Sequence, residues 1–431
     1  MIRGSKNSYL TACIIALLVS LIMSSDGKRA YKWTLNGSEI LVEMETRSGK
    51  MPHGIYAIDP FDPKKPQLLI PGGERPTWSP KKNFFAYIKD QYLYIVRRDG
   101  KEEVNVAWSV PDSGMHFHDP PVRWSWSEGF AIVNRAREFG SVVCDPLPPL
   151  HQWKLFHIGV LESAILPLKT RREVGQIKWG DILTTNNPTF SPDDKFMAAE
   201  VYPAAPMDLQ RSKSRIMIFE FAMDDKEIPM GWYGGVHMFT GPGRRLTNLS
   251  GEVSELMPLW SPTGEWIAFT LCDLEKGYVA PVVVHPYGSG MTLLLPENTL
   301  WPTKKWFPIG VNLLQKAWLE GPPMGPASGW GFPHISVLEW SPDGKYLLLN
   351  QGNKFSCLMV AKWHDGRWWG RGTWGELPYV RFVSWGEGGW FAFIPGRRPT
   401  TEDVICVRNV ETLEGVNLIL GDDAIIRWMD W

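Results

Sequence analysis

The chain has 431 residues, too many for one ordinary hydrophobic core unless the fold repeats a smaller unit. Its 45 basic and 46 acidic side chains give a formal charge of -1, so the positive field of a nucleic-acid-binding protein is missing and no nucleic acid partner is expected. Hydrophobic residues make up 44% of the chain and charged residues 21%, which excludes a disordered chain and a polytopic membrane protein. The 23 Trp, 41 Gly and 35 Pro predict many aromatic anchors and many turns.

Residues 1–25 have the layout of a secretory signal. Arg3 and Lys6 precede an uncharged, mostly apolar run over residues 9–23, and polar residues follow it. This run is shorter than the roughly 20 residues that span a bilayer, so we expect a signal peptide, with a short uncleaved anchor as the alternative. The protein is therefore predicted to be exported to the periplasm or the extracellular space, with residues 26–431 forming one domain.

The cysteines beyond this segment lie far apart and form no C-x-x-C pair. They are Cys144, Cys272, Cys357 and Cys406. This spacing does not indicate a zinc or thiol-redox site, and no cofactor is expected. Export would permit disulfides, but buried free thiols are the preferred interpretation.

A phrase of an aromatic residue, Ser and Pro recurs along the chain, each time before an apolar run typical of a β-strand. The four full copies begin at Trp78, Phe190, Trp260 and Trp340, and degenerate copies begin at Trp124 and Trp385. In residues 341–344 the sequence Ser-Pro-Asp-Gly has the preferences of a type I turn. The strands predicted next to these turns include residues 84–88, 92–96, 196–201, 266–271 and 346–349. Because no long helical pattern intervenes, we predict an all-β array of four-stranded antiparallel sheets, a β-propeller.

We call the aromatic residue that begins each copy its anchor. The spacing of the anchors predicts the number of blades. Neighbouring anchors lie about 45 residues apart where nothing is inserted, as in one propeller blade. Residues 426–431 repeat the pattern of residues 380–385 without a blade of their own, whereas the strand-like runs at 40–45, 54–58 and 67–70 lack a first strand. Pairing the C-terminal strand with this N-terminal sheet would close the ring. We predict seven blades, with six or eight as alternatives.

The repeat resembles the WD40-like repeats of the TolB family, most closely over residues 341–349. Leu246-Thr247 is similar to the ending of the outer strand in such blades. The resemblance implies a propeller over nearly the whole mature chain but no single function. Similar blades occur in periplasmic TolB, in the propellers of prolyl-peptidase-type hydrolases and in some polysaccharide lyases. Two features differ from TolB itself: the predicted signal leaves no room for an N-terminal α/β domain, and three blades carry long insertions.

These insertions are expected to crowd one face of the propeller. Residues 139–153 and 203–214 join the second and third strands of their blades, and residues 296–333 lead to the next blade. The insertions contain the candidate ligand-binding residues Trp153, Trp301, Trp306, Trp318 and Trp330. Such side chains can stack on sugars or anchor peptides, although packing of the insertions onto the propeller is slightly favoured. Deleting residues 296–333 is expected to spare folding and to remove ligand binding.

Histidines offer an alternative chemistry at the mouth of the central channel. His116 and His118 would face the same side of an extended segment, and His334 precedes another innermost strand. Together they could hold a metal in a lyase-like site, with ordinary loop histidines as the default interpretation. A serine hydrolase is not expected, because the chain contains no G-x-S-x-G elbow.

The sequence favours a non-catalytic exported scaffold that binds a protein or an envelope-associated ligand through its loop-rich face. A carbohydrate-active, lyase-like propeller enzyme with a metal at the channel mouth is the main alternative. A structural part of an envelope assembly is the third. Membrane contact is expected only through an uncleaved N-terminal segment.

Overall fold

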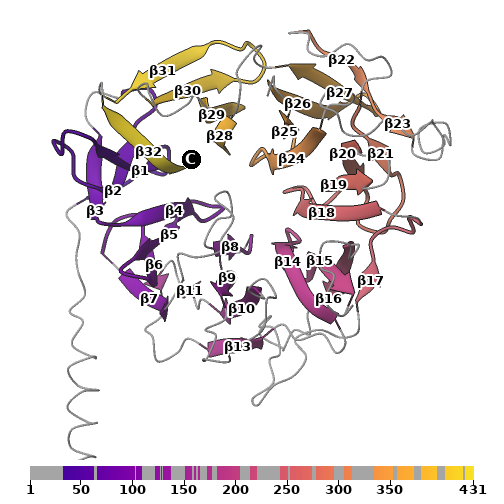
Figure 1. Ribbon diagram of the computed structural model, residues 1–431, viewed down its shortest axis with the longest axis horizontal. Coiled ribbons are helices and arrows are strands. Elements are labelled where there is room, and N and C mark those ends of the chain that lie inside the picture. Colours follow the sequence, from indigo (N-terminus) through magenta and orange to yellow (C-terminus); the bar gives the residue numbers. More distant parts are fainter. Residues whose placement is uncertain are drawn as a thin grey trace, which may run out of the picture.

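The strands of the protein are gathered into sheets around a common centre (Figure 1). The computed structural model describes residues 33–62, 66–101, 103–108, 122–126, 128, 130–136, 151–157, 160–161, 164–165, 172–176, 182–203, 214–220, 243–250, 253–273, 278–295, 305–312, 334–352, 357–372, 380–395, 403–420 and 423–431. These residues form β-strands and turns, with no helix among them. Within the same ranges, no helix has the length and apolar character needed to cross a membrane.

The described residues hold seven sheets of four or five antiparallel strands. From the innermost strand outward, the first two sheets are β32 (Ala424–Asp430), β1 (Ile40–Thr46), β2 (Gly54–Ile58) and β3 (Gln67–Pro71); and β4 (Glu74–Trp78), β5 (Phe84–Lys89), β6 (Tyr92–Arg97) and β7 (Glu103–Trp108). In the same order, the next two are β8 (Val122–Trp124), β9 (Phe130–Ala136), β10 (His151–His157) and β13 (Arg172–Gln176); and β14 (Ile182–Phe190), β15 (Phe196–Pro203), β16 (Arg215–Glu220) and β17 (Arg244–Arg245).

Two five-stranded sheets and one four-stranded sheet follow. They are β18 (Val253–Trp260), β19 (Ile267–Asp273), β20 (Tyr278–Val284), β21 (Thr292–Leu293) and β23 (Val311–Asn312); β24 (His334–Trp340), β25 (Tyr346–Gly352), β26 (Cys357–His364), β27 (Arg367–Gly372) and β22 (Phe307–Ile309); and β28 (Val380–Trp385), β29 (Trp390–Pro395), β30 (Val404–Asn409) and β31 (Gly415–Ile419). A separate pair is formed by β11 (Val160–Leu161) and β12 (Ala164–Ile165).

The strand at the C-terminus is the innermost strand of the sheet built from the N-terminal strands. β32 pairs antiparallel with β1, from Leu41 opposite Asp430 to Thr46 opposite Ala424. The indole of Trp428 on β32 also donates to the carbonyl of Pro76 on β4, at 2.9 Å. The last strand therefore contacts both its own sheet and the next one.

Each full copy of the repeat forms the same turn. The serine hydroxyl accepts the backbone N–H of the residue five positions later, at 2.9 to 3.1 Å in all four copies. In return the serine N–H donates to the carbonyl of that residue. The hydroxyl thus satisfies a buried N–H at the start of the second strand, which explains why serine follows the anchor. The serines are Ser79, Ser191, Ser261 and Ser341.

The fourth position of the turn adopts a positive φ, where glycine has the lowest cost. Gly264 and Gly344 occupy it in two copies, with φ of 77° and 69°. Lys82, Glu128 and Asp194 occupy it in three others, with φ of 55°, 66° and 56°.

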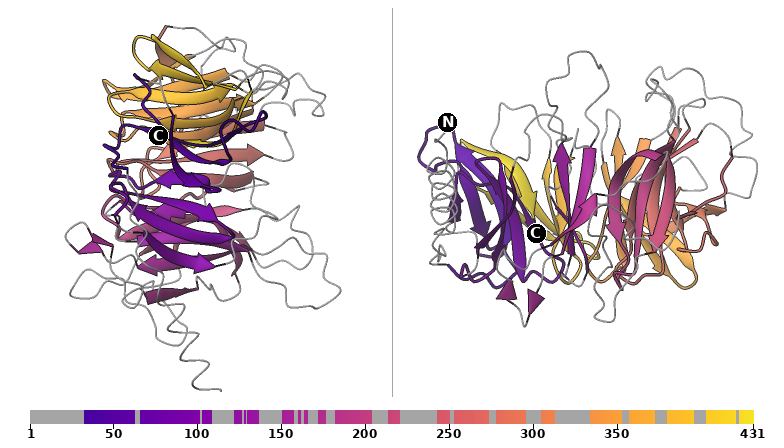
Figure 2. Two further views of the ribbon diagram at one scale, coloured as in Figure 1. Left: turned by 90° about the vertical axis from the view of Figure 1, so that its left-hand side faces the viewer. Right: turned by 90° about the horizontal axis from the view of Figure 1, so that it is seen from below.

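Two of these charged side chains bind the preceding turn. Asp194 accepts the N–H of Trp126, and Glu128 accepts the N–H of Lys81, both at 2.9 Å. Neighbouring turns are therefore linked at one end of the ring. We call this end the turn face and the opposite end the loop face; Figure 2 shows the strands running between the two.

The anchor tryptophans form the core between sheets, as the repeat predicts. Trp78, Trp260, Trp340, Trp385 and Trp431 are each 7% exposed or less. The indole of Trp385 donates to the carbonyl of Glu339, and that of Trp340 to the carbonyl of Leu259. These bonds join each anchor to the inner strand of the sheet before it.

The cysteines that can be assessed are free thiols. Cys406 is buried and Cys272 is partly buried, and neither is in a disulfide. Cys144 lies outside the described residues, and of Cys357 only the backbone is described.

Candidate functional site

Charged side chains occupy the position directly before the anchor on three innermost strands. They are Arg123 on β8, Glu339 on β24 and Asp430 on β32. All three side chains are partly exposed although they lie on strands at the middle of the ring (Figure 1). We call these three residues the central cluster.

Asp430 links three sheets. Its Oδ2 accepts the backbone N–H of Trp78 on β4 at 2.6 Å, and its Oδ1 accepts the hydroxyl of Ser384 on β28 at 2.9 Å. The same hydroxyl accepts the N–H of Trp431 at 3.0 Å. Burial raises the pKa of Asp430 to about 6, even though the donors favour the ionised form.

Glu339 has the equivalent position on β24, two sheets away around the ring, with the β28 sheet between them. The backbone N–H of Trp385 donates to its carboxylate, which ties β24 to β28. Burial, together with the charge of Asp430, raises the pKa of Glu339 well above its usual value.

Lys82 approaches this cluster from the turn between β4 and β5. It is 9% exposed, and its ammonium has no hydrogen-bond partner among the described residues. Burial lowers its pKa, against the charges of the four surrounding carboxylates. These carboxylates are Asp430, Glu387, Glu339 and Glu39. Several perturbed titratable groups in one place are typical of a functional site.

The tryptophan candidates fall mostly outside the described residues. Trp301, Trp318 and Trp330 lie there. Residue Trp153 lies on β10, opposite Asn134 of β9, so the expectation that it belongs to a loop insertion is wrong. Its segment, residues 151–157, completes a sheet and pairs with two other strands.

Trp306 is the one tryptophan candidate whose side chain is described. Its indole donates to Oε2 of Glu411 at 3.2 Å. The ammonium of Lys362 lies 4.0 Å from the centre of its ring, and the guanidinium of Arg371 lies 5.1 Å away. These contacts support the interpretation in which a tryptophan packs its insertion onto the propeller.

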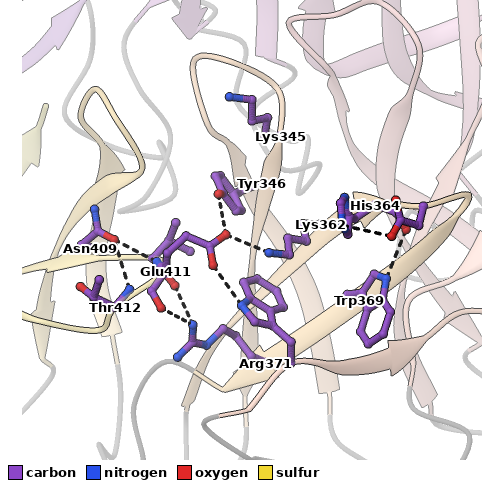
Figure 3. Close-up of polar contacts among 12 residues, drawn as sticks. Lys345, Tyr346, Lys362, His364, Trp369, Arg371, Asn409, Glu411 and Thr412 are labelled. Carbon is purple, nitrogen blue, oxygen red and sulfur yellow. Dashed lines mark hydrogen bonds and ion pairs between the residues drawn. The ribbon is translucent and has the colours of Figure 1, made fainter.

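Glu411 is the centre of this group, which joins two sheets (Figure 3). Its carboxylate accepts the hydroxyl of Tyr346 at 2.7 Å and the ammonium of Lys362 at 2.8 Å, while Arg371 donates to its backbone carbonyl at 2.9 Å. Burial would raise the pKa of Glu411, but the donors outweigh it and the pKa is lowered. We call Trp306, Tyr346, Lys362, Arg371 and Glu411 the Glu411 clasp. Its carboxylate is paired with Lys362, and Arg371 donates to the backbone carbonyls of Val410 and Glu411, so the clasp serves as a structural joint.

The histidine candidates are not brought together by the described residues. His116 and His118 lie outside them, and His334 begins β24 with only its backbone described. Among the described residues, no three His, Cys, Asp or Glu side chains are arranged to hold a metal.

The pattern of the sequence did not predict the central cluster, although a signal for it was present. The residues before the anchors are Thr77, Arg123, Thr189, Leu259, Glu339, Ser384 and Asp430. Charges at three equivalent positions of a β-repeat are unexpected on strands that face the centre of a domain. Aligning the repeats on their anchors and comparing this position would have revealed them.

No family model and no curated protein matches the chain. A solved structure of a puromycin hydrolase S511A mutant complexed with PGG matches with a TM-score of 0.52 and 13% identity, over 94% of this chain and 55% of that one. A puromycin-hydrolyzing peptidase from Mycobacterium tuberculosis matches with a TM-score of 0.50 and 14% identity, over 91% and 54%. TolB from Acinetobacter baumannii matches with a TM-score of 0.41 and 11% identity, over 86% and 71%.

The chain thus spans about half the length of the two hydrolase structures. At such low identity the similarity concerns the fold alone and assigns no family. Together with the four-stranded antiparallel sheets around one centre, it shows that the chain has an all-β propeller fold similar to part of the two hydrolase structures.

Proposed function

We propose that the protein is an exported, seven-bladed β-propeller, closed by the pairing of β32 with β1, that binds a protein or an envelope-associated ligand without catalysis. The seven sheets among the described residues support the blade count, and the register between β32 and β1 supports the closure. The fold supports a scaffold, because each sheet is a rigid unit packed against its neighbours.

The positions of the strand ends support binding through the loop face. Neighbouring strands are antiparallel, so a strand that leaves a serine turn ends at the loop face. Residues 137–150 and 204–213 join such strand ends, and residues 313–333 rejoin the ring at the start of β24, on the same face. Long connections on a rigid scaffold commonly bind ligands.

A capture experiment with matched tryptophan variants tests this proposal. Trp318→Ala and Trp330→Ala change the loop-face segment, while Trp363→Ala removes a tryptophan that is 43% exposed near the turn face. The tagged proteins are expressed in the native host, fractionated and used to capture partners, which are quantified by mass spectrometry. We expect the wild type in the exported fraction, and a partner that is lost with the loop-face variants but kept with Trp363→Ala. Equal capture by all variants, or retention in the cytoplasm, would contradict the proposal.

A further inference from the structure

A rigid turn presents an exposed tyrosine at the turn face. Tyr287 is 82% exposed and lies between β20 and β21, at the same end of the sheet as its serine turn because the strands alternate in direction. Two backbone hydrogen bonds close the turn, from His285 to Ser289 at 2.9 Å and from Gly288 to His285 at 2.8 Å. The ring of His285 stacks on buried Trp266, with 4.0 Å between the ring centres. The exposure of Tyr287 is therefore fixed by the fold, so a ligand can stack on its ring at little cost in conformational entropy.

The guanidinium of Arg244 is held beside this ring. Arg244 lies on β17, the outermost strand of the preceding sheet, and its Nη2 atom donates to the carbonyl of Pro286 at 2.5 Å. The central carbon of the guanidinium is 5.4 Å from the centre of the Tyr287 ring. The two elements approach closely, since a Cβ at Gly288 would lie 2.7 Å from the carbonyl oxygen of Leu246. Contacts with the carbonyl and the ring thus restrict the planar fork of Arg244.

The charge of Arg244 is not balanced by an acid within the described part of the chain. Its contacts there are the carbonyl of Pro286 and the ring of Tyr287. Burial lowers the pKa of Arg244, and no carboxylate of the described residues opposes this effect. One of the five N–H groups of an arginine satisfies the carbonyl, which leaves donors of an exposed guanidinium for a ligand.

The two side chains together place an apolar ring next to a set of charged N–H donors. The arginine fork fits a carboxylate, which accepts two parallel hydrogen bonds from it. The ring fits a flat apolar surface, such as the C–H face of a sugar. A uronic acid carries both groups on one ring, so both contacts can form at once. A protein partner fits less well, because a stable protein interface buries about 1,000 Å² or more.

We propose that Arg244 and Tyr287 form a binding site for a uronic acid residue of an acidic polysaccharide, with the sugar ring on Tyr287 and its carboxylate on Arg244. The site is on the outer part of the turn face, and the long connections of the loop face take no part in it. It gives the scaffold a second ligand, whatever partner the loop face binds.

Three variants separate the contributions of charge and ring. Arg244→Gln removes the charge and keeps a polar side chain, Tyr287→Ala removes the ring, and Tyr287→Phe keeps it. Arg245→Gln is the matched control, because Arg245 is an exposed arginine of the same two-residue strand whose side chain faces the other side of the sheet. All these positions are exposed, so the variants should fold, and thermal unfolding verifies it.

The purified wild type and the variants are titrated by calorimetry with trigalacturonate and with trimannuronate, up to about 20 mM. The fully methyl-esterified trisaccharides keep the sugar rings without the charge, and the peptide acetyl-Asp-Gly-Asp-amide keeps carboxylates without the rings. We expect saturable binding of at least one acidic trisaccharide to the wild type, Arg245→Gln and Tyr287→Phe. Binding should be weakened at least about tenfold in Arg244→Gln and in Tyr287→Ala, and neither the esters nor the peptide should saturate.

Three results would overturn the site: no saturable binding of either acid to the wild type, equal binding of the esters, or unchanged binding by Arg244→Gln. Binding of the peptide as tight as that of the trisaccharides would overturn the assignment of a sugar acid.

Discussion

Two opposite effects act on the pKa of the Asp430 carboxyl group. It accepts hydrogen bonds from neighbouring sheets, which favours the ionised form, and it is largely removed from water, which favours the neutral form. Burial is the larger effect, so the folded protein binds a proton at Asp430 more tightly than the unfolded chain does. The stability of the centre of the ring must therefore depend on pH.

The sign of this dependence follows from the raised pKa. Its folded value, about 6, lies above the ordinary value of about 4 for an unfolded aspartate. The contribution of Asp430 to stability is therefore full below about pH 4 and is lost as the pH rises to about 6. In Asp430→Asn this loss should be absent, so the variant should gain about 2 kcal/mol relative to the wild type between these pH values. Urea unfolding of both proteins across this range measures it, and a constant difference would contradict the assignment.

The fourth turn position offers a test of backbone geometry. Gly344 has φ of 69°, and a Cβ there would lie 2.7 Å from Cγ2 of Thr263 in the neighbouring turn. Gly366 has φ of 74°, but a Cβ there would meet nothing within 4 Å. We expect Gly366→Ala to cost about 1 kcal/mol of unfolding free energy from strain alone. Gly344→Ala should cost about 2 to 3 kcal/mol, because turn packing is also disturbed. Equal losses in urea unfolding would show that the turns do not support each other.

Residues with local roles could be predicted from the sequence, and residues with distant partners could not. The turn at Ser341 is encoded within six residues, since the hydroxyl and the N–H it accepts belong to one short segment. The partner of Asp430 is the N–H of Trp78, far away in the chain. Only after the sheets are arranged around a centre do such charges become neighbours, so the central cluster was missed.

At the scale of elements, residues 305–312 differ most from expectation. They belong to the predicted insertion, but β22 pairs with β27 and β23 pairs with β21. One short segment therefore covers the outer edges of two adjacent sheets, and the Glu411 clasp fastens it to a third. These residues add a fifth strand to each of the two sheets, so the expectation that all of residues 296–333 is a loop is wrong for them.

Two deletions separate the structural part of the insertion from the rest. Replacing residues 313–333 by a Gly-Ser linker leaves β22, β23 and Trp306 in place, so the thermal midpoint should stay within a few degrees of the wild type. Replacing residues 296–333 exposes the edges of β21 and β27 and removes the Trp306 ring that Lys362 and Arg371 contact. This second variant should unfold at a clearly lower temperature and aggregate. Calorimetry and light scattering compare them, and identical midpoints would contradict the role of the edge strands.

Short edge strands are hard to recognise in a sequence. β23 has only two residues, and β22 contains Pro308, which by itself argues against a strand. Their pairing depends on where the chain returns in space. By contrast, β2 was predicted with its observed bounds, and β5 from its first residue, because alternation and turns on both sides are local signals.

At the scale of the whole molecule, β32 connects the two ends of the described chain. Substitutions of two neighbouring residues on it compare the stability that comes from packing with that from an exposed ion pair. Trp428 is 6% exposed, packs against Phe382 and donates to Pro76, whereas Arg427 forms an exposed ion pair with Glu45. Trp428→Ala should cost about 3 to 5 kcal/mol of unfolding free energy and Arg427→Ala about 0.5 kcal/mol. Urea unfolding checks both values, and a small effect of Trp428→Ala would show that the molecule is stable without this contact.

The pairing of β32 with β1 has a consequence during protein synthesis. The ribosome makes β1 long before β32, so the inner edge of β1 has no partner while the strands between them are being made. An unpaired edge with apolar residues such as Val42 and Met44 is a site of aggregation until it is covered. The nascent chain should therefore depend on factors that delay its collapse, and the folding of this sheet should be limited by the arrival of β32.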